Sequence, residues 1–333
     1  MKKVSLLITM ACLLFFATAC SQSSNSSGSA EKKDTYEVAV IVKATDSDFW
    51  QTVLEGAEKA AEEKGKKVNV TTYGPPSEAD IDEQIAILEN VISQNPDGIV
   101  IASTSSDASV PGIERATDKG IPVVLVDNRV KTDKFVSFLA TDNVKGGALG
   151  ADQFVEELKA QGKELKGEVA IISAMAGVQV LIDRDKGFID RLKEIAPDII
   201  PLEIRYVDND ITKALGAAED LLTSKPELLG FFADNNHTGI GVARAITERG
   251  LSEKVPVIAY DGDEEEINAL KSGAIDALIV QDPFGMGYEG VNTVLTSLEG
   301  GSSEKEIDTG ATIVTQDNFE EDDIQKLLFP DKR

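Results

Sequence analysis

The sequence predicts an α/β protein built from two doubly wound parallel-sheet lobes. Short β-branched runs alternate with amphipathic helical stretches, and this alternation occurs in two successive halves of similar size. The length of 333 residues is enough for two compact domains. With 42% hydrophobic and 27% charged residues, the composition is that of an ordinary globular protein.

The first half of the pattern begins at Tyr36. The run YEVAVIV is continuous and β-branched, as expected of a strand buried on both faces, and a helical stretch follows it as far as Gly65. The next expected elements are a strand at 68–73, a helix at 80–93, a strand at 97–103, a helix at 108–119 and a strand at 122–128. This order predicts a parallel sheet that carries helices on both faces.

The second half repeats the pattern without a residue-level repeat. Its expected helices are 143–160, 183–195, 211–224, 238–249 and 264–272. Its expected strands are 168–173, 199–207, 228–234, 255–261 and 276–282. Because the halves are similar in size, we interpret them as two lobes and not as one large sheet.

The N-terminal residues predict export. A positive start, a short apolar run and small residues precede Cys20, as in a secretory signal, and the apolar run is shorter than the ~20 residues of a membrane-spanning helix. A signal that ends directly before a cysteine resembles a bacterial lipoprotein signal, which implies cleavage after residue 19 and a lipid on Cys20. The alternative is a plain secretory signal. The Ser-rich stretch 20–35 is expected to be a tether.

Composition also excludes several classes of function. The formal net charge of −25 disfavours broad nucleic-acid binding. His237 is the only histidine and both cysteines lie at or before Cys20, so neither a metal site nor a catalytic triad is expected. The motif Gly285-x-Gly287-x-x-Gly290 follows Pro283 and is interpreted as helix packing, so no cofactor is expected.

Polar residues follow the expected strands at their carboxyl ends, where open parallel sheets bind ligands. They supply carboxylates, amides, hydroxyls and one ammonium, with two aromatic rings beside the first set, which suits a polyhydroxylated ligand. Each residue has a structural alternative as a helix cap or a core residue. The strand-end residues include Lys43, Ser47, Phe49, Trp50, Ser103, Thr104, Asp127, Asn128, Ser173, Asp234, Asn235, Asn236, Asp261, Gln281 and Asp282.

Across residues 36–315 the chain resembles the type I periplasmic sugar-binding proteins of ABC transporters, in their ribose-binding-like branch. The stretches that carry the resemblance are VAVIVKATDSDFWQTVLEGAEKAAEEKG, GIPVVLVDN, FLATDNVKGGALGA, AGVQVLIDRDKGF, FFADNNHTGIGVARAI, VIAYDGD and LIVQDPFGMGYEGV. The resemblance implies aromatic stacking by Phe49 and Trp50 and hydrogen bonding by strand-end polar groups. The candidate ligand-binding residues are Lys43, Ser47, Phe49, Trp50, Asp127, Asn128, Arg184, Asn209, Asn235, Asp261 and Gln281.

Three positions of the chain depart from the ribose-binding pattern. Asn128 and Ile182 stand where the ribose binders carry arginines, and Asn209 stands where they carry an aromatic residue. The neighbouring Arg184 is a candidate for binding the ligand, and the alternative is that its role is purely structural. Lys43 adds an ammonium, and lysine does not replace a bidentate arginine. We therefore expect a sugar, polyol or sugar derivative other than ribose.

The resemblance further implies two lobes that close on the ligand by hinge motion and present it to a membrane permease. The expected lobes are 36–140 plus 282–310 and 141–281 plus 311–333, with hinge residues Thr141, Asp142, Asp282 and Gly310. We expect a monomeric, extracytoplasmic, lipid-anchored transport protein that is not an enzyme. The alternatives are a sensor of the same fold that presents ligand to a chemoreceptor or histidine kinase, and an exported α/β enzyme.

Overall fold

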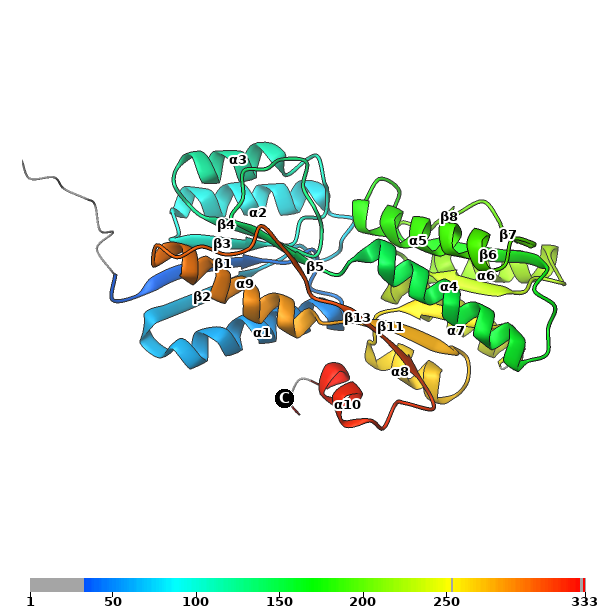
Figure 1. Cartoon of the computed structure of the whole chain (residues 1–333). Coiled ribbons are helices and arrows are strands. Elements are labelled where there is room, and N and C mark those ends of the chain that lie inside the picture. The colour runs from blue at the N-terminus through cyan, green and yellow to red at the C-terminus, as the bar shows by residue number, and fades with distance from the viewer. Residues whose placement is uncertain (1–32, 253, 330–331, 333) are drawn as a thin grey trace, which may run out of the picture. The chain divides into compact units, whose positions relative to one another are not determined.

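The computed structural model describes residues 33–252, 254–329 and 332 (Figure 1). The expected signal peptide (1–19), the lipidation site Cys20 and most of the expected tether (20–35) lie outside these residues. Among the described residues, no helix is long and apolar enough to cross a membrane.

The first sheet has six strands in the order β12-β5-β4-β3-β1-β2, and every neighbouring pair is parallel. Its strands are β1 (Tyr36–Ile41), β2 (Val68–Tyr73), β3 (Gly98–Ile101), β4 (Val123–Val126), β5 (Ser137–Ala140) and β12 (Glu306–Asp308). Helices α1 (Asp48–Lys64) and α9 (Pro283–Leu298) bury apolar side chains against one face, and α2 (Ile81–Gln94) and α3 (Val110–Asp118) cover the other. This sheet and its helices form the N-terminal lobe.

The second sheet has the order β13-β11-β10-β9-β6-β7, and β8 also pairs with β6. Its strands are β6 (Gly167–Ser173), β7 (Ile199–Pro201), β8 (Arg205–Tyr206), β9 (Gly230–Ala233), β10 (Val257–Tyr260), β11 (Ala277–Gln281) and β13 (Ala311–Thr315). Helices α4 (Asn143–Ala160) and α5 (Gln179–Ile195) share one core. Helices α6 (Ile211–Ser224), α7 (Asn236–Glu248), α8 (Glu264–Lys271) and α10 (Asp322–Leu328) share the other. These elements form the C-terminal lobe.

The predicted fold class is therefore confirmed, with three local differences. The expected strand 199–207 is two short strands, because β7 and β8 pair with separate parts of β6, at Gly167–Val169 and at Ile172–Ser173. Strand β5, which the sequence pattern did not suggest, completes the first sheet. Strand β13 runs antiparallel to β11, so the second sheet is not wholly parallel.

The chain passes between the two sheets three times, after β5, after β11 and after β12 (Figure 1). Helix α9 follows β11 of the second sheet but packs on the first, and β13 returns to the second. The two lobes are thus both assembled from distant parts of the sequence, a connectivity that suits relative motion of the lobes about the crossing segments.

Glycines allow one pair of helices in each lobe to approach closely. A Cβ at Gly287 of α9 would lie 1.8 Å from the backbone oxygen of Val53 in α1, and a Cβ at Gly147 of α4 would lie 2.0 Å from the backbone oxygen of Arg184 in α5. The glycine motif at 285–290 therefore lies inside α9, where Gly287 serves helix packing. Both helix pairs lead directly to the strand ends where polar residues gather.

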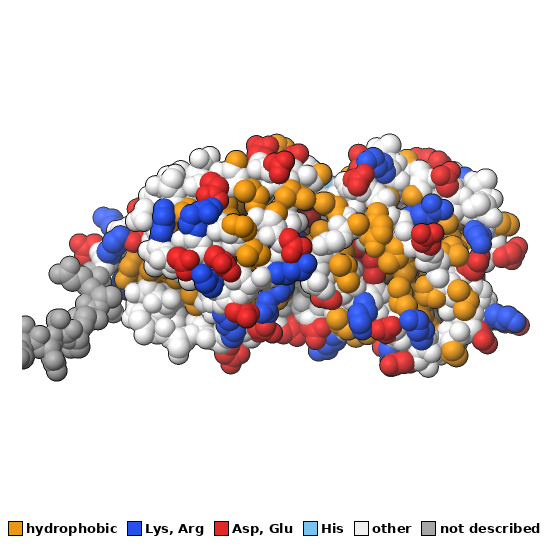
Figure 2. Space-filling view, turned by 90° about the horizontal axis from the view of Figure 1, so that it is seen from above, with side chains coloured by type: hydrophobic (Ala, Val, Ile, Leu, Met, Phe, Trp, Pro, Cys, Tyr) orange, Lys and Arg blue, Asp and Glu red, His pale blue; other side chains and the backbone are white. Residues whose placement is uncertain are grey.

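Basic and acidic side chains are interspersed on the face shown in Figure 2. Short-range ion pairs occur on α5, where Lys186 and Lys193 both contact Asp190 and Arg191 contacts Glu194. Such exposed pairs stabilise a fold by less than about 1 kcal/mol each. The excess of acidic residues thus matters for solubility more than for the architecture.

Candidate functional site

The carboxyl ends of strands from both lobes face a small shared space, which we call the central pocket. Its volume is about 30 Å³, so it has room for only about one or two water molecules. It is lined by Lys43, Phe49, Trp50, Glu78, Asp127, Val178, Val180, Leu181, Arg184, Asn235, Asn236, Asp261 and Gln281.

The N-terminal lobe contributes an ion pair flanked by two aromatic rings. The ammonium of Lys43 lies 2.5 Å from Oδ2 of Asp127, and both side chains are almost completely buried. The same ammonium lies 5.4 Å from the ring centroid of Trp50, which meets Phe49 edge-on at 4.8 Å. Nε1 of Trp50 donates to Glu78 at 2.7 Å, which fixes the plane of the indole. The result is an apolar surface with a charged pair beside it.

Asp127 and Asp261 occupy matching positions in the two lobes. Each is the first residue after its strand, β4 or β10, and each has a left-handed backbone, with φ of 62° and 80°. The backbone N–H of each donates to the next strand of its sheet, Asp127 to Leu139 and Asp261 to Ile279. Non-glycine residues adopt this conformation at an energetic cost, which native structures tend to tolerate at functional sites.

The C-terminal lobe holds Asp261 through amide donors. Nε2 of Gln281 donates to Oδ1 of Asp261 at 2.7 Å, and the backbone N–H of Asn236 donates to Oδ2 at 3.2 Å. Burial nevertheless raises the pKa of Asp261, and these hydrogen bonds and Arg184 oppose that shift only in part. Oε1 of Gln281 is buried and has no hydrogen-bond partner among the described residues, so it can accept a bond from a ligand.

Arg184 lines the central pocket and is 3% exposed. Its Nε donates to Oδ1 of Asn143 and its Nη1 to the backbone oxygen of Asp234, each at 2.8 Å. Its guanidinium lies 4.1 Å from the ring centroid of Tyr260. Burial alone would lower the pKa of Arg184, but the surrounding acidic groups, Asp261 first among them, outweigh it, so the pKa is raised. The guanidinium therefore stays charged.

Several further carboxyl groups of this lobe are buried, and burial raises the pKa of each. For Asp263 the pKa rises to about 7. The pKa values of Asp185 and Asp234, which interact with one another, are both raised, and so is that of Glu266. Asp234 accepts hydrogen bonds from the hydroxyl of Ser173 and from the backbone N–H of Ala174. These two bonds partly offset the increase in the pKa of Asp234 that burial causes.

One hydrogen bond joins the lobes directly at the rim of the pocket. Nδ2 of Asn236, at the start of α7, donates to Oγ of Ser47 at 2.8 Å and to Oδ2 of Asp263 at 2.7 Å. Ser47 precedes α1 in the N-terminal lobe. This contact links the first helix of one lobe to the second lobe.

Most of the predicted ligand-binding residues line the central pocket. Three do not, and each makes a hydrogen bond within the protein. The amide of Asn128 donates to the backbone oxygen of Ser103 and to Ser106. Oδ1 of Asn209 accepts from Asn235, and the hydroxyl of Ser47 accepts from Asn236 of the other lobe. The residues that do are Lys43, Phe49, Trp50, Asp127, Arg184, Asn235, Asp261 and Gln281.

The structure adds residues that the sequence analysis did not select as ligand-binding. Asn236 was visible as a strand-end residue. Glu78 and the apolar residues Val178, Val180 and Leu181 lie in loops or at a helix start and gave no signal. Val178, Val180 and Leu181 add apolar surface from the C-terminal lobe to that of the aromatic pair, so a ligand would meet apolar surface from both lobes.

The predicted hinge residues lie at the crossings between the sheets. Oγ1 of Thr141 donates to the backbone oxygen of Gly310 at 2.9 Å, so two crossings contact one another. The backbone N–H of Asp142 donates to Asp308 at 3.1 Å. Asp282 caps α9 by accepting from the N–H of Gly285, and Gly310 has a φ of 79°.

The donor set favours binding of neutral hydroxyl groups. Within the described part of the chain, no group of three His, Cys, Asp or Glu could hold a metal ion. The sole histidine, His237, forms a hydrogen bond between Nδ1 and the backbone oxygen of Asn209. Carboxylates, amides and cationic groups around an aromatic pair match hydroxyl groups on a ring with apolar C–H faces.

Comparison with known proteins agrees with this chemistry. A model of the periplasmic binding protein domain matches residues 38–302. The chain belongs to the periplasmic binding protein family. It is 31% identical over 272 residues to the D-allose-binding periplasmic protein of Escherichia coli (strain K12), which covers 80% of this chain and 85% of that protein.

Two solved structures extend the family comparison. A carbohydrate transporter solute-binding protein from Agrobacterium radiobacter, in complex with D-arabinose, is 39% identical, with a TM-score of 0.85 over 88% of this chain and 99% of that one. An ABC transporter solute-binding protein from Agrobacterium vitis, with bound D-fucose, is 34% identical, with a TM-score of 0.83 over 88% and 100%. This periplasmic binding protein is thus a type I member of the sugar-binding group that serves ABC transporters.

Proposed function

We propose that this periplasmic binding protein captures a neutral monosaccharide in the central pocket and delivers it to an ABC import permease. The observation that carries the proposal is the convergence of Phe49, Trp50 and Asp127 from one lobe with Arg184 and Asp261 from the other. The relatives bind D-allose, D-arabinose and D-fucose, which are all neutral sugars with a single ring.

The proposed contacts follow from the chemistry of each wall. Phe49 and Trp50 stack on the C–H face of the sugar, and Asp127 and Asp261 accept hydrogen bonds from hydroxyl groups on opposite sides. Lys43 and Arg184 donate to hydroxyl or ring oxygens. Asn235 and Gln281 supply amides that both donate and accept. Ser47, Asn128 and Asn209 hold the walls in place rather than touch the sugar.

Entry of the sugar requires the lobes to separate, because the pocket of about 30 Å³ is smaller than a sugar ring. We place the lobe boundaries at 36–140 plus 282–310 and 141–281 plus 311–333, with bending at Thr141, Asp142, Asp282 and Gly310. Only the closed form contacts the sugar from both sides, so the sugar shifts the population toward closure.

The proposal includes location and partners. The protein works outside the cytoplasm, as its relatives do, and we propose that a lipid on Cys20 holds it at the membrane while residues 20–35 act as a tether. It acts as a monomer, and it binds its ligand without chemical conversion. The similar solved proteins are solute-binding proteins of transporters, which favours transport over a sensory role.

Titration with a sugar panel tests the proposal. Trp50 is the only tryptophan of the chain and lines the pocket, so intrinsic fluorescence and calorimetry should both report binding of D-allose, D-arabinose, D-fucose or a related sugar. Asp127→Ala and Asp261→Ala should each weaken binding at least 100-fold, because a buried group that has lost its hydrogen-bond partner costs ~1–3 kcal/mol for each bond.

The exposed Asp220→Ala on α6 is the matched control and should leave the dissociation constant unchanged. The proposed function would be contradicted if no monosaccharide in the panel bound, or if both pocket variants kept near-native affinity.

A further inference from the structure

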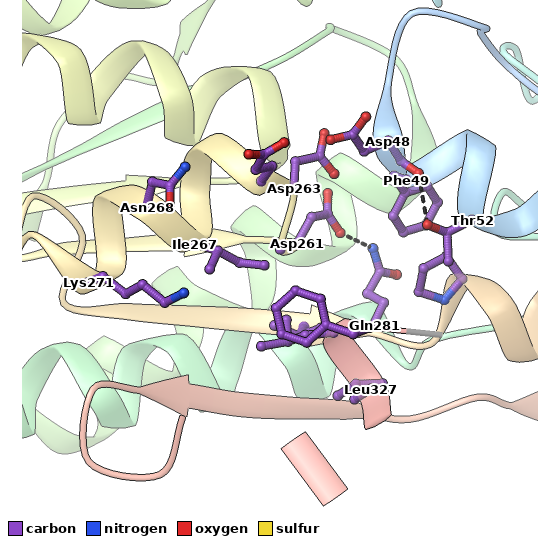
Figure 3. Close-up of a pocket in the computed structure, with 16 residues that line it drawn as sticks. Asp48, Phe49, Thr52, Asp261, Asp263, Ile267, Asn268, Lys271, Gln281 and Leu327 are labelled. Carbon is purple, nitrogen blue, oxygen red and sulfur yellow. Dashed lines mark hydrogen bonds between the residues drawn. The ribbon is translucent and has the colours of Figure 1, made fainter. Parts of the chain in front are cut away.

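A second and larger cavity adjoins the central pocket below helix α8 (Figure 3). We call it the α10 cavity, because the end of α10 forms one of its walls. Its volume is about 430 Å³, within the usual range of roughly 300–1,000 Å³ for sites that take small molecules. It is lined by Asp48, Phe49, Thr52, Asp261, Gly262, Asp263, Glu264, Ile267, Asn268, Lys271, Val280, Gln281, Pro283, Leu327, Leu328 and Phe329.

The two spaces share part of their walls. Phe49, Asp261 and Gln281 line both the central pocket and the α10 cavity. Between them stands the hydrogen bond from Gln281 to Asp261, which is drawn as a dashed line in Figure 3. A ligand held by Asp261 and Gln281 in the central pocket therefore lies next to the α10 cavity.

Gln281 leaves an acceptor unused at this junction. Its side chain is 2% exposed, and its Oε1 has no hydrogen-bond partner among the described residues. A buried amide oxygen without a donor costs ~1–3 kcal/mol. A hydroxyl group of a ligand that spans the junction would satisfy it.

Apolar and polar residues both line the α10 cavity. The apolar part of its wall consists of Ile267, Val280, Pro283, Leu327, Leu328 and Phe329, and the polar part of Asp48, Thr52, Asp263, Glu264, Asn268 and Lys271. Asn268 and Lys271 are exposed, so the cavity opens to solvent at that end. A ring with apolar faces and polar edges matches this division.

Helix α10 is held against the turn that carries Asp261. A Cβ at Gly262 would lie 2.8 Å from Cδ2 of Leu328, so Leu328 packs on the residue that follows Asp261. The apolar wall is therefore continuous with the sugar-binding turn, and a substituent that contacts α10 lies within reach of a sugar that contacts Asp261.

We propose that the α10 cavity is a second subsite and that the protein accepts glycosides, in which the sugar lies in the central pocket and a ring-sized anomeric substituent lies in the α10 cavity. The inference rests on the proposed sugar-binding function. It extends the substrate class from free monosaccharides to disaccharides and aryl glycosides.

The test compares free sugars with glycosides on the full chain. Calorimetry would measure D-arabinose and D-fucose, then their methyl and phenyl glycosides in both anomeric configurations. We expect at least one phenyl glycoside to bind within about threefold of its free sugar or more tightly. A monosaccharide-only site would reject every phenyl glycoside by more than 100-fold, and that result would overturn the proposal while leaving the sugar-binding function intact.

Two variants of one residue then locate the substituent. Leu327→Trp fills the α10 cavity and Leu327→Ala removes part of its apolar wall, and Leu327 does not line the central pocket. Both should leave the Kd of the free sugar within about twofold. Leu327→Trp should weaken the phenyl glycoside at least tenfold and Leu327→Ala about threefold.

The control is Lys326→Trp, an exposed neighbour on α10 that lines neither space. It should change neither Kd. Equal effects of Leu327→Trp on sugar and glycoside, or no effect on the glycoside in either Leu327 variant, would show that the substituent lies elsewhere. If neither the free sugars nor the wider monosaccharide panel bind, the proposed function itself fails.

Discussion

The two walls of the central pocket surround two equivalent aspartates with different electrostatic environments. In the N-terminal lobe, Asp127 follows β4 and is matched by the ammonium of Lys43 at 2.5 Å. In the C-terminal lobe, Asp261 follows β10 and is held by the amide of Gln281 and one backbone N–H. Both aspartates have left-handed backbones. The same strand-end geometry thus carries a paired charge in one lobe and a carboxyl with a raised pKa in the other.

This difference assigns different roles to the walls. The ion pair beside the two rings forms a surface whose charge is already neutralised. On the side of the C-terminal wall, Asp185, Asp234 and Asp261 interact with the buried guanidinium of Arg184, and Asp263 is buried near Asp261. We therefore expect that wall to dominate the response of the protein to charge changes and to pH.

Loss of Arg184 should have the largest effect. Arg184→Met removes the guanidinium that lies among several buried carboxyl groups and breaks its bonds to Asn143 and Asp234. Removing one partner of a buried charge network costs about 3–5 kcal/mol. Chemical denaturation should show that loss, and calorimetry should show no sugar binding. Arg191→Met on the same helix removes only exposed ion pairs, to Asp152 and Glu194, and should cost about 1 kcal/mol or less. Equal losses in both variants would refute the special role of Arg184.

Substitution of the equivalent aspartates should change stability by different amounts. Asp127→Asn leaves the ammonium of Lys43 buried without a carboxylate and should lower the unfolding free energy by about 3 kcal/mol. Asp261→Asn replaces a carboxyl group whose pKa is raised because burial disfavours its charged form. At pH 8 this substitution should therefore cost no stability. Both should weaken sugar binding, as measured by tryptophan fluorescence.

The double variant Lys43→Met/Asp127→Asn is the control for the first of these changes. Because it removes both charges, it should recover most of the stability lost in Asp127→Asn without restoring binding. If Asp127→Asn and Asp261→Asn destabilise the protein equally, the proposed contrast between the lobes is wrong.

Sequence analysis predicted the fold class because buried parallel strands and amphipathic helices leave strong periodic signals. It also selected Asp127 and Asp261, because ligands in open sheets meet the ends of strands. It could not show that the amide of Asn128 turns toward Ser103, since a residue one position from a strand end can point either way. Glu78 and Leu181 reach the pocket only through the tertiary arrangement, and the α10 cavity depends on where the C-terminal helix packs.

Stability should fall as the pH rises from about 4 to 7. An unfolded aspartate loses its proton near pH 4, whereas Asp263 keeps its proton in the folded protein up to about pH 7. The folded state therefore binds more protons in this window, and each such group lowers the unfolding free energy by up to about 1.4 kcal/mol per pH unit. Asp263→Asn should flatten the slope measured by denaturation at several pH values. Asp220→Asn, which is exposed, should leave it unchanged.

The direct bond between the lobes should have the smallest effect, and its removal separates closure from sugar contact. Ser47 does not line the central pocket, and its hydroxyl accepts from Asn236 of the opposite lobe at 2.8 Å. Ser47→Ala should therefore weaken sugar binding only about threefold to tenfold, because one hydrogen bond contributes ~0.5–1.5 kcal/mol. The loss should appear as faster dissociation, since only the closed form contains this bond. The control in stopped-flow fluorescence is Thr52→Ala on α1. The hydroxyl that it removes donates to the backbone oxygen of Asp48 in the same lobe. If Ser47→Ala slows association and leaves dissociation unchanged, the bond acts before closure and not as its latch.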